Sequence, residues 1–245
     1  MNKLNNKMII SYITAGDPDL KTTEECIISM QEAGSDVIVL GVPFSDPIAE
    51  SKEIQDSNIR ALNSKTYTND IFEMLDKLNL KDISIVLYTY MNPLFCYGYE
   101  AFCKRCQEVG VKGLMFADMP FEEKEEIDSI ANKYNIDIIM NSPLSTKERI
   151  QKITKEAKGF VGIFPQRDNA IDMENCIKDI KEVNNIPVCM NIDLLSKENQ
   201  NKAIKLADGI MSACQNAKIL KIYGKQAPEH LFNFITTLKE KLKEI

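Results

Sequence analysis

The strongest constraint on the fold is a regular alternation between short β-rich runs and longer segments of helical periodicity. Eight runs of β-branched and aromatic residues are separated by segments in which apolar residues recur every three or four positions. This alternation is typical of βα units on a parallel sheet, and eight such units close a barrel. The predicted strands are residues 9–14, 37–40, 83–88, 114–116, 136–140, 160–164, 188–190 and 210–212.

The chain length supports the same fold. Its 245 residues lie close to the roughly 250 that are typical of such barrels, and no linker or low-complexity tract divides them. We therefore expect one single-domain (β/α)8 TIM barrel over residues 1–245. The predicted helices are residues 22–33, 68–78, 99–109, 122–134, 146–157, 173–184, 197–206 and 230–244. The expected N-caps are Thr22 or Thr23, Ser145 or Thr146, and Ser196, and the expected C-terminal glycines are Gly34, Gly110, Gly159 and Gly209.

Charge and hydropathy exclude several classes of partner. The net charge of −6 gives no general attraction to nucleic acid or to anionic membranes. No stretch reaches the roughly 18 apolar residues of a membrane span, and the polar N-terminus does not fit a signal peptide. We expect a cytoplasmic protein that binds neither nucleic acid nor membrane.

The cysteines do not indicate a disulfide framework or a metal site. Seven of them are scattered along the chain, which is typical of reduced thiols in a cytosolic protein. Cys103 and Cys106 form a C-x-x-C pair, but they lie in a predicted helix, without a second pair, and far in sequence from His230, the only histidine. We favour a partly buried helix face for this pair over metal or redox chemistry, and we expect no bound metal.

Four motifs lie where predicted strands end, which is where barrel enzymes place their reactive groups. They are residues 14–18 (TAGDP), 40–47 (LGVPFSDP), 90–93 (YMNP) and 117–120 (ADMP). Through these motifs the chain resembles the alpha-chain family of tryptophan synthase. The resemblance covers nearly the whole chain, and its matches concentrate in the first half.

The resemblance implies a two-acid lyase chemistry that this chain has altered. Members of the family cleave indole-3-glycerol phosphate into indole and glyceraldehyde 3-phosphate, using a glutamate at the end of the second strand and an aspartate in the following loop. Those two positions fall on Val39 and Glu50. Valine cannot transfer a proton, and Glu50 moves its carboxylate by one methylene. Ser51 and Lys52 stand where a small Gly-Pro pair is usual.

The expected phosphate-binding loops are also altered. The family holds its phosphate with glycine-rich loops, whereas the matching stretches here are residues 165–170 (PQRDNA), 191–193 (NID) and 213–214 (AC). Asp168 and Asp193 would repel a dianion, and Arg167 would compensate in part. The position of an aromatic residue that usually lies near the indole falls on Gly162.

The resemblance also assigns binding roles. Tyr90, Asn92 and Asp118 would face the substrate, with a helix cap as the alternative role for Asp118. A beta chain would contact the barrel through two loops, and pyridoxal phosphate would belong to that partner, leaving no cofactor in this chain. The interface residues are Asp17, Pro18, Asp46 and Pro47.

Three functions remain open from the sequence. The favoured one is an alpha-like subunit, a pseudoenzyme with lost or much reduced cleavage that still pairs with a beta-like chain. The second is an active enzyme, either the ordinary lyase of tryptophan biosynthesis working through Glu50 or a repurposed barrel acting on a non-phosphorylated small molecule. The third is a structural or binding role without a beta chain. A barrel fold by itself does not choose among them.

Overall fold

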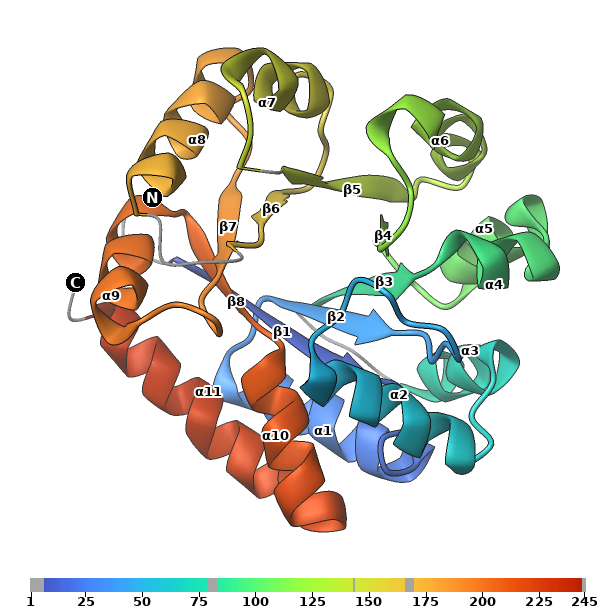
Figure 1. Cartoon of the computed structure of the whole chain (residues 1–245). Helices are drawn as coiled ribbons and strands as arrows, with labels where there is room; N and C mark the ends of the chain where they lie inside the picture. The colour runs from blue at the N-terminus through green and yellow to red at the C-terminus, as the bar shows by residue number, and fades with distance from the viewer. Residues whose placement is uncertain (1–6, 79–82, 143, 166–169, 244–245) are drawn as a thin grey trace.

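A computed structural model describes residues 7–78, 83–142, 144–165 and 170–243, which form a closed barrel of parallel strands (Figure 1). The eight strands follow one another around the barrel in chain order, and β8 pairs with β1. The predicted barrel is confirmed, with strand ends that move by one or two residues. The strands are β1 (Met8–Thr14), β2 (Val37–Gly41), β3 (Ser84–Thr89), β4 (Gly113–Phe116), β5 (Asp137–Ser142), β6 (Val161–Ile163), β7 (Val188–Asn191) and β8 (Gly209–Ser212).

Strand residues alternate between two apolar cores. In β1 and β2, Ile10, Tyr12 and Val39 belong to the cluster inside the barrel, whereas Ile9 and Leu40 belong to the cluster between strands and helices. This follows from the two-residue period of a strand, which places successive side chains on opposite faces. The strand register pairs Tyr12 with Val39, so these side chains lie side by side in the inner layer.

The helices form an outer ring, and three of them were not predicted from the sequence (Figure 1). The chain-terminal helix α11 packs against α1 and closes the ring. The unpredicted helices are α2 (Lys52–Asn63), α4 (Met91–Tyr97) and α10 (Cys214–Tyr223). The others are α1 (Leu20–Ala33), α3 (Thr68–Lys77), α5 (Tyr99–Glu108), α6 (Lys124–Lys133), α7 (Lys147–Thr154), α8 (Ala170–Val183), α9 (Lys197–Leu206) and α11 (Ala227–Lys243), with single 3-10 turns at Phe121–Glu123 and Gly224–Gln226.

Three of the expected helix caps were wrong. Asp19, rather than Thr22 or Thr23, caps α1, and its carboxylate accepts a hydrogen bond from the Thr22 amide at 2.8 Å. Gly209 does not end a helix; it opens β8, where an added Cβ would lie 2.8 Å from both Cys189 and Met8. The expected N-caps Thr146 and Ser196 are confirmed, and Gly34 and Gly110 have the positive φ of C-terminal cap residues. Gly159 also has a positive φ, but it lies in the loop beyond α7, whose C-cap is Lys155.

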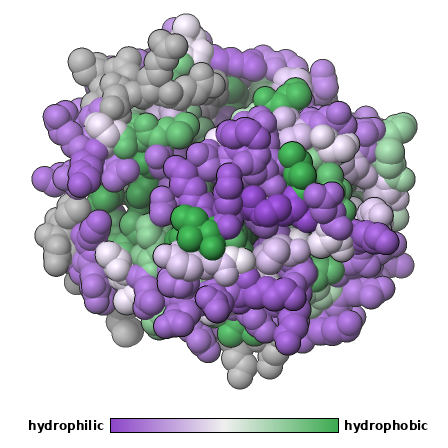
Figure 2. Space-filling model, turned by 60° about the horizontal axis from the view of Figure 1, so that its bottom comes forward, coloured by the Kyte–Doolittle hydropathy of each residue, from purple (hydrophilic) through white to green (hydrophobic). Residues whose placement is uncertain are grey.

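The surface carries no extended apolar face in the view of Figure 2, where hydrophobic residues lie in separate patches among hydrophilic ones. Across the described residues, no helix combines the length and the apolar character that crossing a bilayer requires.

Candidate functional site

A cavity of about 520 Å³ opens at the carboxyl ends of the strands, a size that suits a small organic molecule. Its floor is made by inward-facing side chains of the inner core, because the strands present alternate residues to the barrel axis. Residues of the loops after β2, β6, β7 and β8 form its mouth. The residues from the strands include Ile10, Tyr12, Val39, Tyr88, Met115 and Met211.

Val39 is part of the cavity wall. Its side chain is only 1% exposed and packs in the inner core beside Tyr12 and Val86. The position that the resemblance assigns to a catalytic glutamate therefore faces the ligand space, but it carries an aliphatic group. Among the described residues that line the cavity, Glu50 is the only aspartate or glutamate.

Glu50 lies at the cavity mouth and is held by Tyr90. The Tyr90 hydroxyl donates a hydrogen bond to Glu50 Oε2 and accepts the amide protons of Ile48 (3.0 Å) and Ala49 (3.1 Å). The ring of Phe44 packs on Tyr90 with 4.7 Å between centroids. One buried phenol thus fixes both the acid and the loop that carries it.

The phenols around Glu50 stay protonated at neutral pH. Burial, followed by the hydrogen bond to Glu50, raises the pKa of Tyr90 to about 12. Burial together with the charge of Glu50 raises the pKa of Tyr88 well above its usual value, and burial does the same for Tyr12. These hydroxyls can therefore donate hydrogen bonds. At neutral pH they are not ionised, so they cannot act as general bases.

Asp193, in the loop after β7, binds the N-terminus of α10 at the rim of the cavity. Its Oδ2 accepts the amide protons of Ala213 and Cys214, both at 2.6 Å, and its Oδ1 accepts the hydroxyl of Ser212 at 3.0 Å. Ala213 has no side chain that could cap this helix itself. The sequence predicted that Asp193 would repel a phosphate, but it did not predict that its carboxylate bonds to these amides. Arg167 and Asp168 lie outside the described residues.

The expected substrate residues Asn92 and Asp118 are exposed and lie outside the cavity lining. Asn92, in the first turn of α4, accepts a weak bond from the Cys96 thiol at 3.8 Å. Asp118 Oδ1 accepts the Met91 amide proton at 2.9 Å, so it caps α4 rather than the turn that follows it in sequence. Their substrate contacts stay predictions.

Gly162 leaves room for the ring of Phe164, the first residue after β6. A Cβ at Gly162 would lie 3.0 Å from Phe164 Cε2 and 2.9 Å from Asn141 Oδ1. Both Phe164 and Asn141 line the cavity. An aromatic ring therefore borders the ligand space from a position two residues beyond the glycine.

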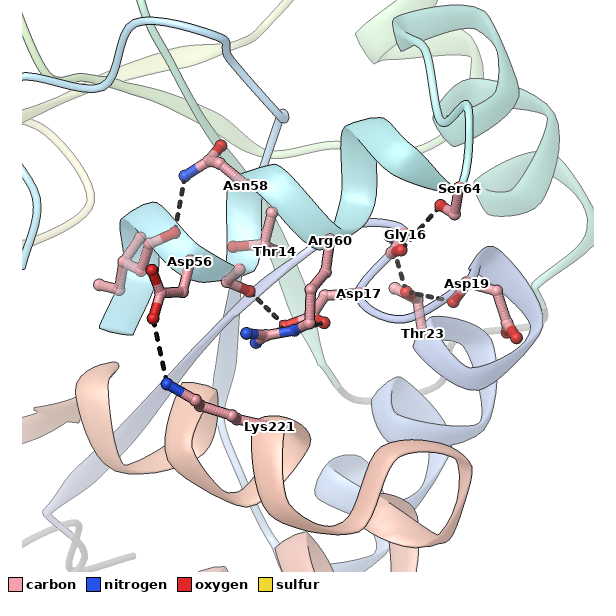
Figure 3. A network of polar contacts seen from close by, with 12 residues as sticks. Thr14, Gly16, Asp17, Asp19, Thr23, Asp56, Asn58, Arg60, Ser64 and Lys221 are labelled. Carbon is pink, nitrogen blue, oxygen red and sulfur yellow. Dashed lines mark hydrogen bonds and ion pairs between the residues drawn. The ribbon is translucent and has the colours of Figure 1, made fainter. Parts of the chain in front are cut away.

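Of the four expected interface residues, Asp17 is buried. Its carboxylate forms a two-point ion pair with Arg60, both bonds at 2.6 Å, and accepts the hydroxyl of Ser57 (Figure 3). Figure 3 also shows Lys221 of α10 reaching Asp56 of α2, at 3.1 Å. Asp17 thus joins the loop after β1 to α2 inside the chain, and a direct contact with a partner stays a prediction. Pro18 and Pro47 are partly exposed and Asp46 is exposed.

The C-x-x-C pair is structural. Cys103 and Cys106 are fully buried on the inner face of α5, and burial raises the pKa of both thiols. Within the ranges that the structure covers, no group of three histidine, cysteine or acidic residues could hold a metal ion. The predicted helix face is confirmed by their place on α5, and both side chains are buried completely rather than partly.

Comparison with known proteins places the chain in a family. The sequence model of the tryptophan synthase alpha chain family matches residues 1–244. The chain belongs to the tryptophan synthase alpha chain family. The tryptophan synthase alpha chain of Thermoanaerobacter sp. is 37% identical over 96% of this chain and 94% of its own length, and that of Lacticaseibacillus casei is 33% identical over 96% and 91%.

Solved structures agree with this assignment. A tryptophan synthase complex from Pyrococcus furiosus contains a chain that is 27% identical, with a TM-score of 0.86 over 98% of this chain and 99% of that chain. The tryptophan synthase subunit alpha of Legionella pneumophila has the same fold, with a TM-score of 0.90 at 24% identity over 98% of this chain and 94% of that one. In this alpha-family barrel, Val39 and Glu50 lie on one cavity, and Asp193 lies at its rim.

Proposed function

We propose that this chain is an alpha-type subunit that no longer performs the ordinary cleavage of indole-3-glycerol phosphate and that pairs with a pyridoxal-phosphate-dependent beta chain. In this proposal the cofactor belongs to the partner, the complex is cytoplasmic, and this chain contributes a binding barrel. The proposal combines family membership with the residues that line the cavity.

The observation that carries the proposal is Val39 on the cavity wall. Cleavage of a carbon–carbon bond to an indole ring requires one group that protonates the ring carbon and another that accepts the ring nitrogen proton. Only one carboxylate, that of Glu50, lines the described part of the cavity. A single acid cannot occupy both sides of a substrate ring.

The environment of Glu50 weakens its use as a general base. Its carboxylate already accepts the Tyr90 hydroxyl, and Tyr90 is anchored by two loop amides. A glutamate in place of an aspartate also moves the oxygens by about one ångström, which costs roughly 100-fold in a preorganised site. Both effects lower the rate of cleavage, as does the loss of the second acid.

Pairing is supported by the loop after β2. It exposes Asp46, and the neighbouring Ile48 is 82% exposed, the highest value among the large hydrophobic residues of the described chain. Phe95 of α4 is 71% exposed. An exposed apolar side chain on a loop that is held in one conformation can anchor a partner. The hydrogen bonds to Tyr90 hold this loop in one conformation before a partner binds.

Analytical ultracentrifugation with the beta chain from the same source tests the pairing. We expect a complex that Ile48→Asp weakens by at least about 10-fold, because an apolar anchor is replaced by a charge. Ile222→Asp is the matched control, since Ile222 is 71% exposed on α10 and lies outside this loop. Absence of a complex, or equal weakening by both variants, would contradict the proposed interface.

A further inference from the structure

At the rim of the cavity, the N-terminus of α10 forms an anion-binding site, here called the anion seat. A side chain of the protein itself already occupies it. α10 begins at Cys214 and has ten residues, so its first amides carry the partial positive charge of a helix N-terminus. Such amides are well suited to bind a phosphate or carboxylate. Here the amides of Ala213 and Cys214 both donate to Asp193 Oδ2.

Asp193 is held firmly in this position. Its second oxygen accepts the Ser212 hydroxyl at 3.0 Å, and its own amide donates to Asn191 Oδ1, also at 3.0 Å. Both carboxylate oxygens are therefore used, and the loop after β7 is fixed to the end of β8. A carboxylate in this geometry satisfies the same donors that an external anion would need.

The described part of the cavity lining carries no positive charge. Among the described lining residues none is a lysine or arginine, and Glu50 adds a carboxylate at the mouth. Nearby cations on α10 are engaged at the surface, since Lys218 pairs with Glu53 at 3.6 Å and Lys221 with Asp56 at 3.1 Å. An anionic ligand would meet the carboxylate of Glu50 and, at the N-terminus of α10, amides that Asp193 already occupies.

The walls instead suit an uncharged aromatic molecule. Phe164, Tyr88, Met115 and Val39 supply apolar surface, and Asn141 Oδ1 is buried without a hydrogen-bond partner among the residues described. Buried polar atoms are normally paired, so this oxygen is available to a ligand donor. With Glu50 it gives the cavity two hydrogen-bond acceptors.

We infer that Asp193 is a specificity-determining residue: it occupies the anion seat at α10 and restricts the cavity to uncharged aromatic ligands that donate hydrogen bonds through N–H. This inference deepens the proposed function, and it rests on that proposal because it assigns the ligand class of the same cavity. It also accounts for the aspartate that stands where the family has a glycine-rich loop.

Calorimetric titration with inorganic phosphate tests the inference. We expect no saturable binding of phosphate to the wild-type protein. Asp193→Gly should bind phosphate saturably, a gain in affinity of at least roughly 100-fold, because one like charge is removed and two amides are freed. Asp193→Asn keeps the side-chain carbonyl that holds the loop but removes the charge. Its gain in phosphate affinity should therefore be smaller than that of Asp193→Gly. Glu240→Gln, an equal change of charge at an exposed position of α11, should behave like the wild type.

A second titration uses indole as the uncharged probe. Wild-type protein should bind indole, and Asp193→Gly should bind it with equal affinity. Saturable phosphate binding by the wild type, or failure of both folded Asp193 variants to gain phosphate binding, would overturn the anion-seat inference. Failure of the wild type to bind indole would overturn the ligand class.

These outcomes separate the inference from the proposed function. Cleavage of indole-3-glycerol phosphate without any binding of free phosphate would overturn the proposed function alone. Phosphate binding without cleavage would overturn the inference alone. If neither Asp193 variant folds, the two titrations of the wild type decide: indole binding without saturable phosphate binding supports the inference, and saturable phosphate binding contradicts it.

Discussion

The hydroxyl of Tyr90 donates a hydrogen bond to the carboxylate of Glu50, and the same oxygen accepts the amides of Ile48 and Ala49. A residue at the end of β3 therefore orders the loop after β2. The acid on the cavity and the exposed surface proposed for a partner share this one anchor. Changes at the cavity mouth are thereby coupled to the proposed interface.

Removing the Tyr90 hydroxyl should loosen this loop. In Tyr90→Phe the amides of Ile48 and Ala49 lose their acceptor, and we expect their hydrogen exchange to accelerate by about 10-fold, in line with roughly 1 kcal/mol per net hydrogen bond. Exchange followed by mass spectrometry or NMR measures this. Tyr97→Phe, which removes a hydroxyl bonded to the exposed Asn69, should leave both amides unchanged. Unchanged exchange in Tyr90→Phe would contradict the anchoring role.

The ion pair of Asp17 and Arg60 should contribute strongly to stability. The Asp17 side chain is fully buried and that of Arg60 is 27% exposed. Arg60→Met leaves a buried carboxylate without its cation, so we expect a loss of about 3 kcal/mol in the free energy of unfolding, measured with urea. Lys202→Met, which breaks an exposed pair with Glu198 on α9, should cost less than about 1 kcal/mol. Equal losses in the two variants would refute this assignment.

Alkaline pH should destabilise the protein partly through Tyr90. Its pKa is raised from 10.0 to about 12 in the folded protein, so the unfolded chain loses this proton first as the pH rises. The stabilisation is complete below pH 10 and is lost progressively between pH 10 and 12. Tyr90→Phe should therefore show a shallower decline of stability over this window. A decline as steep as that of the wild type would show that Tyr90 does not contribute.

Most of the barrel could be predicted from the sequence because strand and helix periods are local properties. All eight strands were located, since each is a short β-rich run with turn residues on both sides. α2 was missed because its buried face includes Ser57 and Asn58 and only one large apolar residue, Ile54. α4 was missed because Pro93 looked like a turn, although proline is tolerated in the first turn of a helix.

The site was predictable only in part, for a related reason. Val39 and Glu50 were located because a strand end and the motif after it fix their register. The capping of α10 by Asp193 spans 20 residues, and the capping of α4 by Asp118 spans 27. Such contacts depend on how separate loops meet in space, which no local pattern in the sequence encodes. Asp193 directly after β7 was the one available signal.

Restoring the missing acid alone should not restore cleavage. In Val39→Glu a carboxylate enters the cavity wall, but Asp193 still fills the anion seat, so we expect no turnover of indole-3-glycerol phosphate from the single variant. The double variant Val39→Glu, Asp193→Gly should release indole at a measurable rate. Val39→Gln combined with Asp193→Gly is the control for shape without proton transfer. Cleavage by Val39→Glu alone would show that the phosphate loops are intact.

We propose that this alpha-family barrel lacks the pair of acids that cleaves indole-3-glycerol phosphate. A steady-state assay of indole release by the wild-type protein, alone and with its beta chain, tests this proposal most directly. We expect no release above that of a sample without this chain. Turnover at the rate of active relatives, abolished by Glu50→Gln, would contradict it.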